Sequence, residues 1–296
     1  MKKLGRLLTA MVTPFKEDGE VDYAQAKKLA LALLDSGSDG LVLAATTGES
    51  PTLSWEEEMH LFAEVKSAVG GRGTIVAYTG SNSTAEAVTA TRGAEKIGVD
   101  ACLLVVPYYN KPTQEGLYQH FKTIAQSTSL PCILYNVPAR TVTSLSPDTT
   151  IKLSHIDNII GVKEASGNLG QISKIISEVR KNFLVWSGND SDTFHILALG
   201  GYGTISVASH LVGNQIKEMI DSAISGRMDE AASIHRRLLP LIDALFIVSN
   251  PVPVKYALNH IGFYVGKPRL PLTEPDEKSA ALIRDTLKNY KIDLSV

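Results

Sequence analysis

A single lysine ends a short apolar run near the middle of the chain, residues 158–165, with the sequence NIIGVKEA. β-Branched residues dominate the run and turn residues follow at once, which is typical of a buried strand. An amine carried into an apolar interior loses the water that supports its charge, so the neutral, nucleophilic form of Lys163 becomes accessible. Schiff-base chemistry requires such a lysine. The alternative is a lysine at a strand end whose amine reaches solvent.

Hydroxyl and amide side chains follow several other apolar runs. If these runs are strands of one parallel barrel, their carboxyl ends lie at the same rim, where barrels of this kind carry their chemistry. The set has one lysine and no pair of carboxylates. It therefore suits proton transfer through hydroxyl groups, and it does not suit glycosidase chemistry or metal-assisted hydrolysis. The set includes Thr13, Thr46, Thr47, Tyr108, Tyr109, Tyr135, Asn136, Lys163, Gly188, Asn189 and Ser206.

Signals for other chemistries are absent from the sequence. The seven histidines are scattered without metal-ligand spacing, and there is no nucleophile elbow and no P-loop. Cys102 and Cys132 lie in apolar runs, so we expect core thiols in a reducing compartment.

Composition narrows the possible partners. The 29 basic and 31 acidic residues give a net charge of −2, without long runs of either sign. This balance argues against nucleic acid or a membrane surface as a partner. No stretch approaches the ~20 apolar residues of a membrane span, and no signal-length apolar segment follows the basic N-terminus. We expect a soluble, cytoplasmic protein.

The elements that must position these residues repeat as strand–helix units. Capping residues mark where several of the helices should begin, and one example is the capping box formed by Ser54 and Glu57. Eight such units fit a (β/α)8 TIM barrel. The alternative is an open doubly wound sheet, which needs a glycine-rich turn after its first strand that this sequence lacks. The strands are expected at residues 7–13, 40–45, 74–78, 101–106, 131–135, 159–163, 183–186 and 204–207.

The pattern turns purely helical after Met228, with helices expected at 229–248, 254–258 and 276–288. We therefore expect a catalytic barrel over residues 1–226. Residues 227–296 form a C-terminal helical extension in this interpretation, packed on the barrel or on a neighbouring subunit. No linker-like segment separates the two parts.

Six segments together resemble the signature of the 4-hydroxy-tetrahydrodipicolinate synthase family. This family belongs to the pyruvate-dependent class I aldolases, which are built on a (β/α)8 barrel and include N-acetylneuraminate lyase. The likeness runs from about residue 7 to residue 271. The segments are TAMVTPF (9–15), TTGES (46–50), PYYNKP (107–112), YNVPAR (135–140), GVKEA (161–165) and NPVPVK (250–255).

The resemblance implies a lyase of lysine and diaminopimelate biosynthesis. Lys163 would form an imine with pyruvate, and the derived enamine would attack the aldehyde of aspartate semialdehyde. No cofactor is implied beyond this covalent imine, and no metal. Tyr135 would pass protons to and from the imine carbon, with Thr47 and Tyr109 as the other members of a hydroxyl relay. Tyr109 would reach a neighbouring subunit, which implies a homo-oligomer, a tetramer built as a dimer of dimers.

Substrate-binding roles follow from the same resemblance. Thr46 and Thr47 would hold the pyruvate carboxylate through their backbone N–H groups, and the main chain at Ile205 would close that pocket. The Arg140 guanidinium would fork onto the carboxylate of the second substrate. The candidate substrate-binding residues also include Gly188, Asn189 and Asn250.

The chain differs from some members of the family at two positions that bear on regulation, and two other functions are alternatives to the synthase. Lysine-inhibited relatives carry histidines where this chain has Trp55 and Glu58, so we expect weak or absent feedback by lysine. The nearest rival is an aldolase such as N-acetylneuraminate lyase or a 2-keto-3-deoxy-sugar-acid aldolase, but Tyr109 together with Arg140 favours the synthase. A non-catalytic pyruvate-binding barrel is the rival of another class.

Overall fold

The computed structural model describes residues 4–295, which form eight strands in sequence order around a closed barrel. Pairing is parallel between β1 and β2 and along the series from β3 to β8. Nearly every strand residue is buried, because a parallel sheet covered by helices is enclosed on both faces. The expected (β/α)8 barrel is confirmed. The strands are β1 Leu7–Ala10, β2 Gly40–Leu43, β3 Thr74–Tyr78, β4 Ala101–Val105, β5 Cys132–Asn136, β6 Ile159–Glu164, β7 Leu184–Ser187 and β8 Gly203–Ser206.

The first strand is three residues shorter than predicted. From Val12 onward, the hydrogen bonds of the chain go to groups outside the sheet. The Val12 N–H donates to the His210 ring, and the Thr13 hydroxyl donates to the Gly48 carbonyl. Several helices begin at the predicted caps. In the Ser54 box, for example, the serine oxygen accepts from the Glu57 N–H and the Glu57 carboxylate accepts from the Ser54 N–H.

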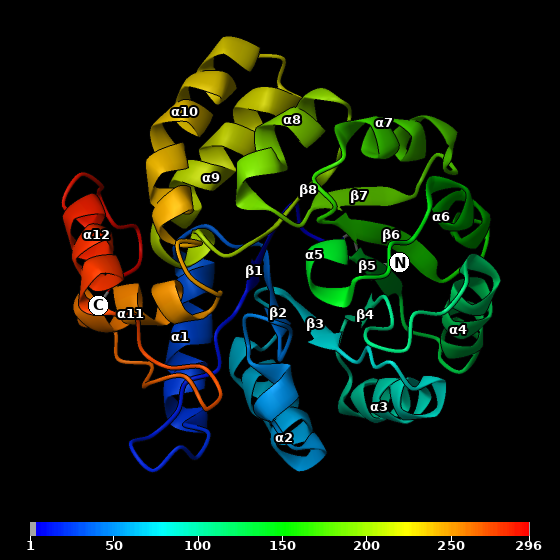
Figure 1. Cartoon of the computed structure of the whole chain (residues 1–296), viewed down its shortest axis with the longest axis horizontal. Coiled ribbons are helices and arrows are strands. Elements are labelled where there is room, and N and C mark those ends of the chain that lie inside the picture. Colours follow the sequence, from blue (N-terminus) through cyan, green and yellow to red (C-terminus); the bar gives the residue numbers. More distant parts are fainter. Residues whose placement is uncertain (1–3, 296) are drawn as a thin grey trace. The chain divides into compact units, whose positions relative to one another are not determined.

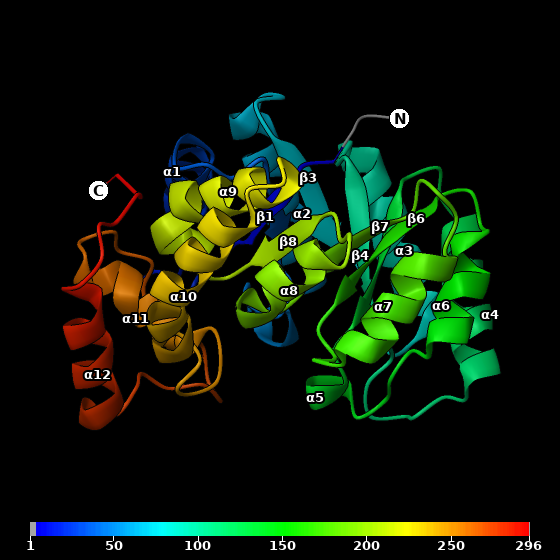
Figure 2. The same ribbon diagram turned by 90° about the horizontal axis from the view of Figure 1, so that it is seen from above.

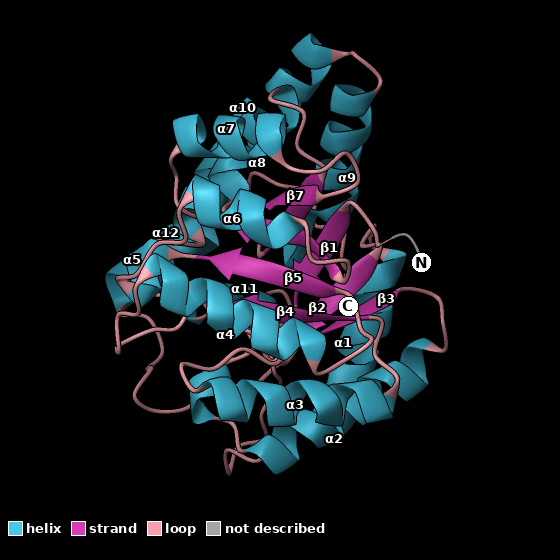
Figure 3. Ribbon diagram, turned by 90° about the vertical axis from the view of Figure 1, so that its right-hand side faces the viewer, coloured by secondary structure: helices cyan, strands magenta, loops and turns pink. Residues whose placement is uncertain are grey.

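Two compact units divide the described chain, and the first is Ile75–Ile205. Its helices α4, α6 and α7 follow one another along the outside of the sheet (Figure 2), and Figure 3 shows α4 and α6 alongside β5. The one-turn helix α5 was not predicted, because one turn is too short to show a period. The helices are α3 Thr84–Ile97, α4 Gln114–Gln126, α5 Pro138–Thr141, α6 Pro147–Ser154, α7 Leu169–Glu178 and α8 Thr193–Ala198, with a 3-10 turn η2 at Asp190–Asp192.

The second unit comprises residues 4–74 and 206–295. In it α12 packs on both α10 and α11 (Figure 1, red, yellow and orange). The chain after residue 227 is purely helical among its regular elements, as predicted, although α10 ends at Ala244, four residues early. The predicted boundary at residue 226 stays a prediction. The helices are α1 Tyr23–Asp35, α2 Trp55–Val69, α9 Ser209–Ile224, α10 Met228–Ala244, α11 Val252–His260 and α12 Glu277–Leu287, with a 3-10 turn η1 at Ser50–Thr52.

Among residues 4–295, no helix has both the length and the apolar character needed to span a bilayer. Both cysteines are buried free thiols, as expected, and they are Cα partners on β4 and β5.

Candidate active site

Lys163 lies inside the protein, near the end of β6. Only 5% of its surface is exposed, so the alternative in which its amine reaches solvent is wrong. Tyr135 is its Cα partner on β5, and the Lys163 Nζ lies 4.3 Å from the centroid of the Tyr135 ring. The structure thus brings together a buried primary amine and a phenol, the two groups that imine chemistry with proton transfer requires.

Gly188 makes room for this lysine. A Cβ atom at Gly188 would lie 3.1 Å from the Lys163 Cγ and 2.7 Å from the Ala165 Cβ, so any side chain there would crowd the amine-bearing stem. Asn189 has a structural partner instead, because its side-chain amide donates to Asp192 at 2.8 Å. Ile205 is 1% exposed on β8.

A buried carboxyl group that sequence analysis missed stands beside Lys163. Glu164 is 1% exposed, and its Oε1 accepts from the Asn136 side chain at 2.6 Å. The Ser166 hydroxyl donates to its other oxygen. Burial raises the pKa of Glu164, while Ser166 and Asn136 oppose that shift. The residue stood within a signature segment, but nothing in the local pattern indicated that its side chain is buried.

The segment that carries Arg140 is tied down through this network. The Asn136 carbonyl Oδ1 accepts from the Leu145 N–H at 2.9 Å, so a single side chain joins both ends of the loop that contains α5. The Thr141 hydroxyl adds a bond to the Thr143 carbonyl inside the loop. Arg140 itself is exposed near the end of α5.

Tyr109 projects from the loop after β4. It is 90% exposed and adopts a φ of 72°, in the left-handed region that a non-glycine residue rarely enters. Two side-chain bonds hold the loop: Asn82 donates to the Tyr108 carbonyl at 3.1 Å, and Asn110 donates to the Asn82 carbonyl at 2.8 Å. These bonds fix the backbone of the loop, and the Tyr109 side chain extends from it into solvent.

In the second unit, the loop after β2 carries Thr46 and Thr47. Thr47 is buried at 3% exposure, and its Oγ1 accepts from the Asn250 Nδ2 at 2.9 Å. The loop contains two non-glycine residues with positive φ, Ala44 at 49° and Glu49 at 61°. Such conformations persist only where surrounding contacts determine them.

For Glu49, a buried ion pair supplies such contacts. The Lys255 Nζ donates to the Glu49 carboxylate at 2.8 Å, and each side chain is 1% exposed. Its remaining hydrogens meet the carbonyls of Thr13 and Lys267, both at 3.1 Å. Burial lowers the pKa of Lys255 to about 8, and the Glu49 carboxylate opposes this shift. The other Glu49 oxygen accepts from the Arg269 N–H.

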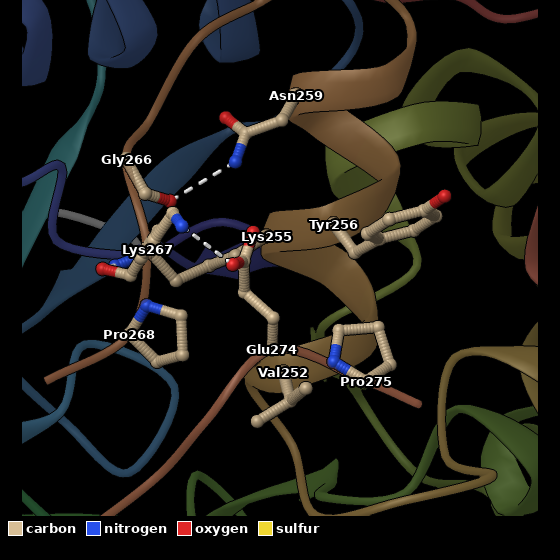
Figure 4. A pocket seen from close by; sticks show the side chains of 9 residues that line it. All are labelled: Val252, Lys255, Tyr256, Asn259, Gly266, Lys267, Pro268, Glu274 and Pro275. Carbon is tan, nitrogen blue, oxygen red and sulfur yellow. Dashed lines mark hydrogen bonds and ion pairs between the residues drawn. The ribbon is translucent and has the colours of Figure 1, made fainter. Parts of the chain in front are cut away.

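The stem of Lys255 also lines a cavity of about 10 Å³, between α11 and the segment that follows it (Figure 4). This segment is held by a bond from Asn259 to the Gly266 carbonyl and by the Lys267–Glu274 ion pair, at 3.0 and 2.7 Å. The volume has room for about one water molecule and not for a substrate.

No three His, Cys, Asp or Glu side chains within residues 4–295 stand close enough together to hold a metal ion.

The fold is a (β/α)8 barrel that carries a buried lysine beside a tyrosine on the adjacent strand. The chain belongs to the dihydrodipicolinate synthetase family, whose model matches residues 3–290. It is 71% identical over 296 residues to a 4-hydroxy-tetrahydrodipicolinate synthase from Dehalococcoides mccartyi, with 100% of both chains covered.

Solved structures show the same likeness. A dihydrodipicolinate synthase from Bacillus anthracis matches with a TM-score of 0.96 and 43% identity, covering 98% of this chain and 100% of that one. The enzyme from Cyanidioschyzon merolae, crystallised with lysine bound, matches with a TM-score of 0.95 and 46% identity, covering 97% and 98%.

Proposed function

We propose that this protein condenses pyruvate with L-aspartate 4-semialdehyde to give 4-hydroxy-tetrahydrodipicolinate, through an imine on Lys163. The observation that carries the proposal is the buried Lys163 amine, 4.3 Å from the Tyr135 ring centroid on the adjacent strand. Membership of the dihydrodipicolinate synthetase family and the 71% identical synthase support the choice of reaction.

The first half-reaction activates pyruvate. The neutral Lys163 amine attacks the ketone carbon, and the resulting carbinolamine loses its hydroxyl as water to leave a cationic imine. The cation draws electrons from the neighbouring methyl group, which loses a proton and becomes an enamine. In the proposal, Tyr135, Thr47 and Tyr109 carry the protons of these steps, because each hydroxyl can accept one proton while giving up another.

The second half-reaction forms the ring. The enamine carbon attacks the aldehyde carbon of the semialdehyde, a carbon–carbon bond forms, and the aldehyde oxygen takes up a proton. The amino group of the second substrate then attacks the imine carbon and displaces Lys163 as a free amine. One water is released overall and no electrons change hands, so the sequence is complete without a cofactor or a metal.

Binding roles are proposed for the residues around the reacting atoms. The backbone N–H groups of Thr46 and Thr47 hold the pyruvate carboxylate, beside the main chain of Ile205. Gly188 leaves space at Lys163, and Asn189 and Asn250 remain candidate binding residues. Arg140, exposed on α5, forks onto the carboxylate of the second substrate. A sugar-acid aldolase would not need this fork, and retro-aldol assays separate the two functions.

The proposal includes a homo-oligomer, most simply a tetramer made of two dimers. Its support is Tyr109, because a proton-relay residue that is 90% exposed in one chain becomes enclosed only when another subunit covers it.

Borohydride trapping tests the proposed function. The protein is incubated with pyruvate and sodium borohydride, then digested and analysed by mass spectrometry. We expect a reduced pyruvate adduct on Lys163, and its absence in the Lys163→Met variant, which should also lose activity with both substrates in a coupled assay. An unmodified Lys163 in the native protein would contradict the proposal and favour a non-catalytic pyruvate-binding barrel.

A further inference from the structure

The Arg140 loop, residues 137–144, contains two features that are unfavourable by themselves. Val142 adopts a φ of 61°, in the left-handed region, where the side chain of a β-branched residue crowds the neighbouring carbonyl. Thr143 is 8% exposed, and its hydroxyl has no hydrogen-bond partner among the described residues. A strained conformation of this kind persists only where surrounding contacts determine it. The loop therefore needs to be held from outside.

Asn136, the last residue of β5, supplies such a contact. Its Oδ1 accepts from the Leu145 N–H at 2.9 Å, and this bond joins the two residues that flank the Arg140 loop. Both residues are 0% exposed, so the bond does not compete with bulk water. A backbone N–H can only donate, so the amide oxygen of Asn136 faces Leu145 and the amide nitrogen faces the other way.

Glu164 holds the other side of the same amide. The Asn136 Nδ2 donates to the Glu164 Oε1 at 2.6 Å, between residues that are Cα partners on β5 and β6. The Ser166 hydroxyl donates to the second oxygen of Glu164, also at 2.6 Å, so both carboxyl oxygens are engaged. Glu164 directly follows Lys163. The amide that anchors the Arg140 loop is therefore tied to the strand that carries the proposed nucleophile.

We infer that Asn136 is a positioning residue for the second substrate: it holds the Arg140 loop in a conformation that the loop would not keep unaided, and so sets where Arg140 lies relative to Lys163. The inference rests on the proposed function, since it assumes that Arg140 binds the carboxylate of the second substrate. Asn136 needs no contact with either substrate in this role. Its loss should therefore weaken binding of the second substrate while imine formation with pyruvate continues.

Asn136→Ala tests the role by separating the two substrates. We expect the KM for aspartate semialdehyde to rise about tenfold, because a displaced Arg140 no longer meets the substrate carboxylate. The KM for pyruvate should change little, and borohydride should still trap pyruvate on Lys163. In an Arg140→Ala background, Asn136→Ala should add no further rise, because the residue that it positions is gone.

Val142→Gly supplies a rescue that a packing role would not show. Glycine adopts a positive φ without crowding, so the loop can keep its shape without the anchor. The double variant Asn136→Ala with Val142→Gly should therefore recover most of the lost affinity for aspartate semialdehyde, measured by its KM. Val142→Gly alone should raise the midpoint of urea denaturation, because it removes the strain. A lower midpoint would contradict the premise that the loop is strained, and the inference would fall with it.

Asn158→Ala is the matched control. Asn158 stands just before β6, at the opposite end of the strands from the Arg140 loop. Its amide donates to three carbonyls at and after the end of α4, those of Ala125, Thr128 and Leu130. The same substitution there also releases a loop, so it should lower stability. It should not change the KM for either substrate, and a tenfold rise for aspartate semialdehyde there would show that general loosening explains the effect of Asn136→Ala.

A native KM for aspartate semialdehyde in folded Asn136→Ala overturns the inference, and so does a double variant that stays as impaired as Asn136→Ala. If Asn136→Ala does not fold, Thr141→Val replaces it. That change removes the hydroxyl bond to the Thr143 carbonyl, 2.7 Å long, with little change of shape, and a native KM there overturns the inference too.

The proposed function is tested separately in parallel. Failure of borohydride trapping on the native protein rejects that function, and a native KM for aspartate semialdehyde in Arg140→Ala rejects the proposed role of Arg140. A pyruvate adduct and an impaired Arg140→Ala, together with a native KM in Asn136→Ala, reject only the role of Asn136.

Discussion

Two buried lysines show how surroundings assign a residue its role. The Lys255 amine meets three oxygen acceptors, Glu49 and two backbone carbonyls, within 3.1 Å. Its three hydrogens are satisfied by these oxygens. The Lys163 amine instead faces an aromatic ring, with a glycine beside its stem. Burial alone would not distinguish the two, but their neighbours make one structural and leave the other available for chemistry.

Glu58 predicts a pH dependence of stability at the same scale. Burial raises the pKa of this carboxyl to about 8, the Ser50 hydroxyl opposes the shift, and Glu57 adds to it. Between the ordinary value of 4.5 and about 8, the unfolded chain has lost this proton while the folded protein keeps it. The contribution of Glu58 to stability is therefore complete below pH 4.5 and is lost as pH rises through 8.

We expect Glu58→Gln to match the native protein at pH 5 and to be more stable at pH 8, by up to about 1.4 kcal/mol for each pH unit of that range. Urea denaturation across the range measures this difference. Glu56→Gln, on the exposed side of the same helix, should show no such gain. Equal stability of native protein and Glu58→Gln at both pH values would show that the carboxyl ionises freely.

At the scale of elements, α11 stabilises the loop after β2 through the ion pair between Lys255 and Glu49. The loop has positive φ at Ala44 and Glu49, and Glu49 is held by a lysine of α11 that lies more than 200 residues away in sequence. Glu164 has a corresponding part in the first unit, where Asn136 ties β5 and β6 to the loop that carries Arg140. In both cases a buried polar side chain positions a segment whose own sequence would leave it free.

Removing one partner of the buried pair should be costly. Lys255→Met leaves the Glu49 carboxylate buried without its cation, and we expect a loss of about 3–5 kcal/mol in the free energy of unfolding. The double variant Lys255→Met with Glu49→Gln should regain much of it, because no uncompensated charge remains. Thermal or urea denaturation measures both.

The matched control is Lys27→Met, which breaks the surface pair with Glu64, whose side chains are 41% and 32% exposed. That change should cost less than about 1 kcal/mol. A similar small cost for Lys255→Met would mean that α11 does not depend on this pair.

At the scale of the whole molecule, one proposed catalytic residue makes little contact with its own chain and is exposed to solvent. Tyr109 is 90% exposed on a loop that Asn82 and Asn110 hold in place. A phenol in bulk solvent has no advantage in proton transfer over water, so its place in the proposed relay requires a second subunit.

Mixing two inactive variants tests this arrangement. Lys163→Met lacks the nucleophile and Tyr109→Ala lacks the exposed phenol, so each alone should be nearly inactive. In a mixed oligomer, one site combines the intact Lys163 of one chain with the intact Tyr109 of the other, and we expect activity to return after unfolding and refolding the two together. Mixtures that stay inactive, although sizing shows that oligomers form, would place Tyr109 in its own chain's chemistry or outside it.

Local patterns in the sequence determined much of the fold. Apolar runs bounded by turn residues predicted the eight strands, and capping residues such as Asp22 and Ser54 predicted where helices begin, because both signals act within a few residues. The strand that carries Lys163 was predicted for the same reason, and the signature segments indicated the family.

The tertiary structure decided which polar groups are buried and what they meet. The bonds of Asn250 to Thr47 and of Lys255 to Glu49 join residues 203 and 206 positions apart, and no local periodicity reports on such pairs. The burial of Glu58 and Glu164 likewise depends on neighbouring elements, since a carboxyl group in a helix or strand looks the same in sequence whether it faces water or the interior. Local propensity fixes the elements, whereas only chain packing sets the surroundings that give a side chain its chemistry.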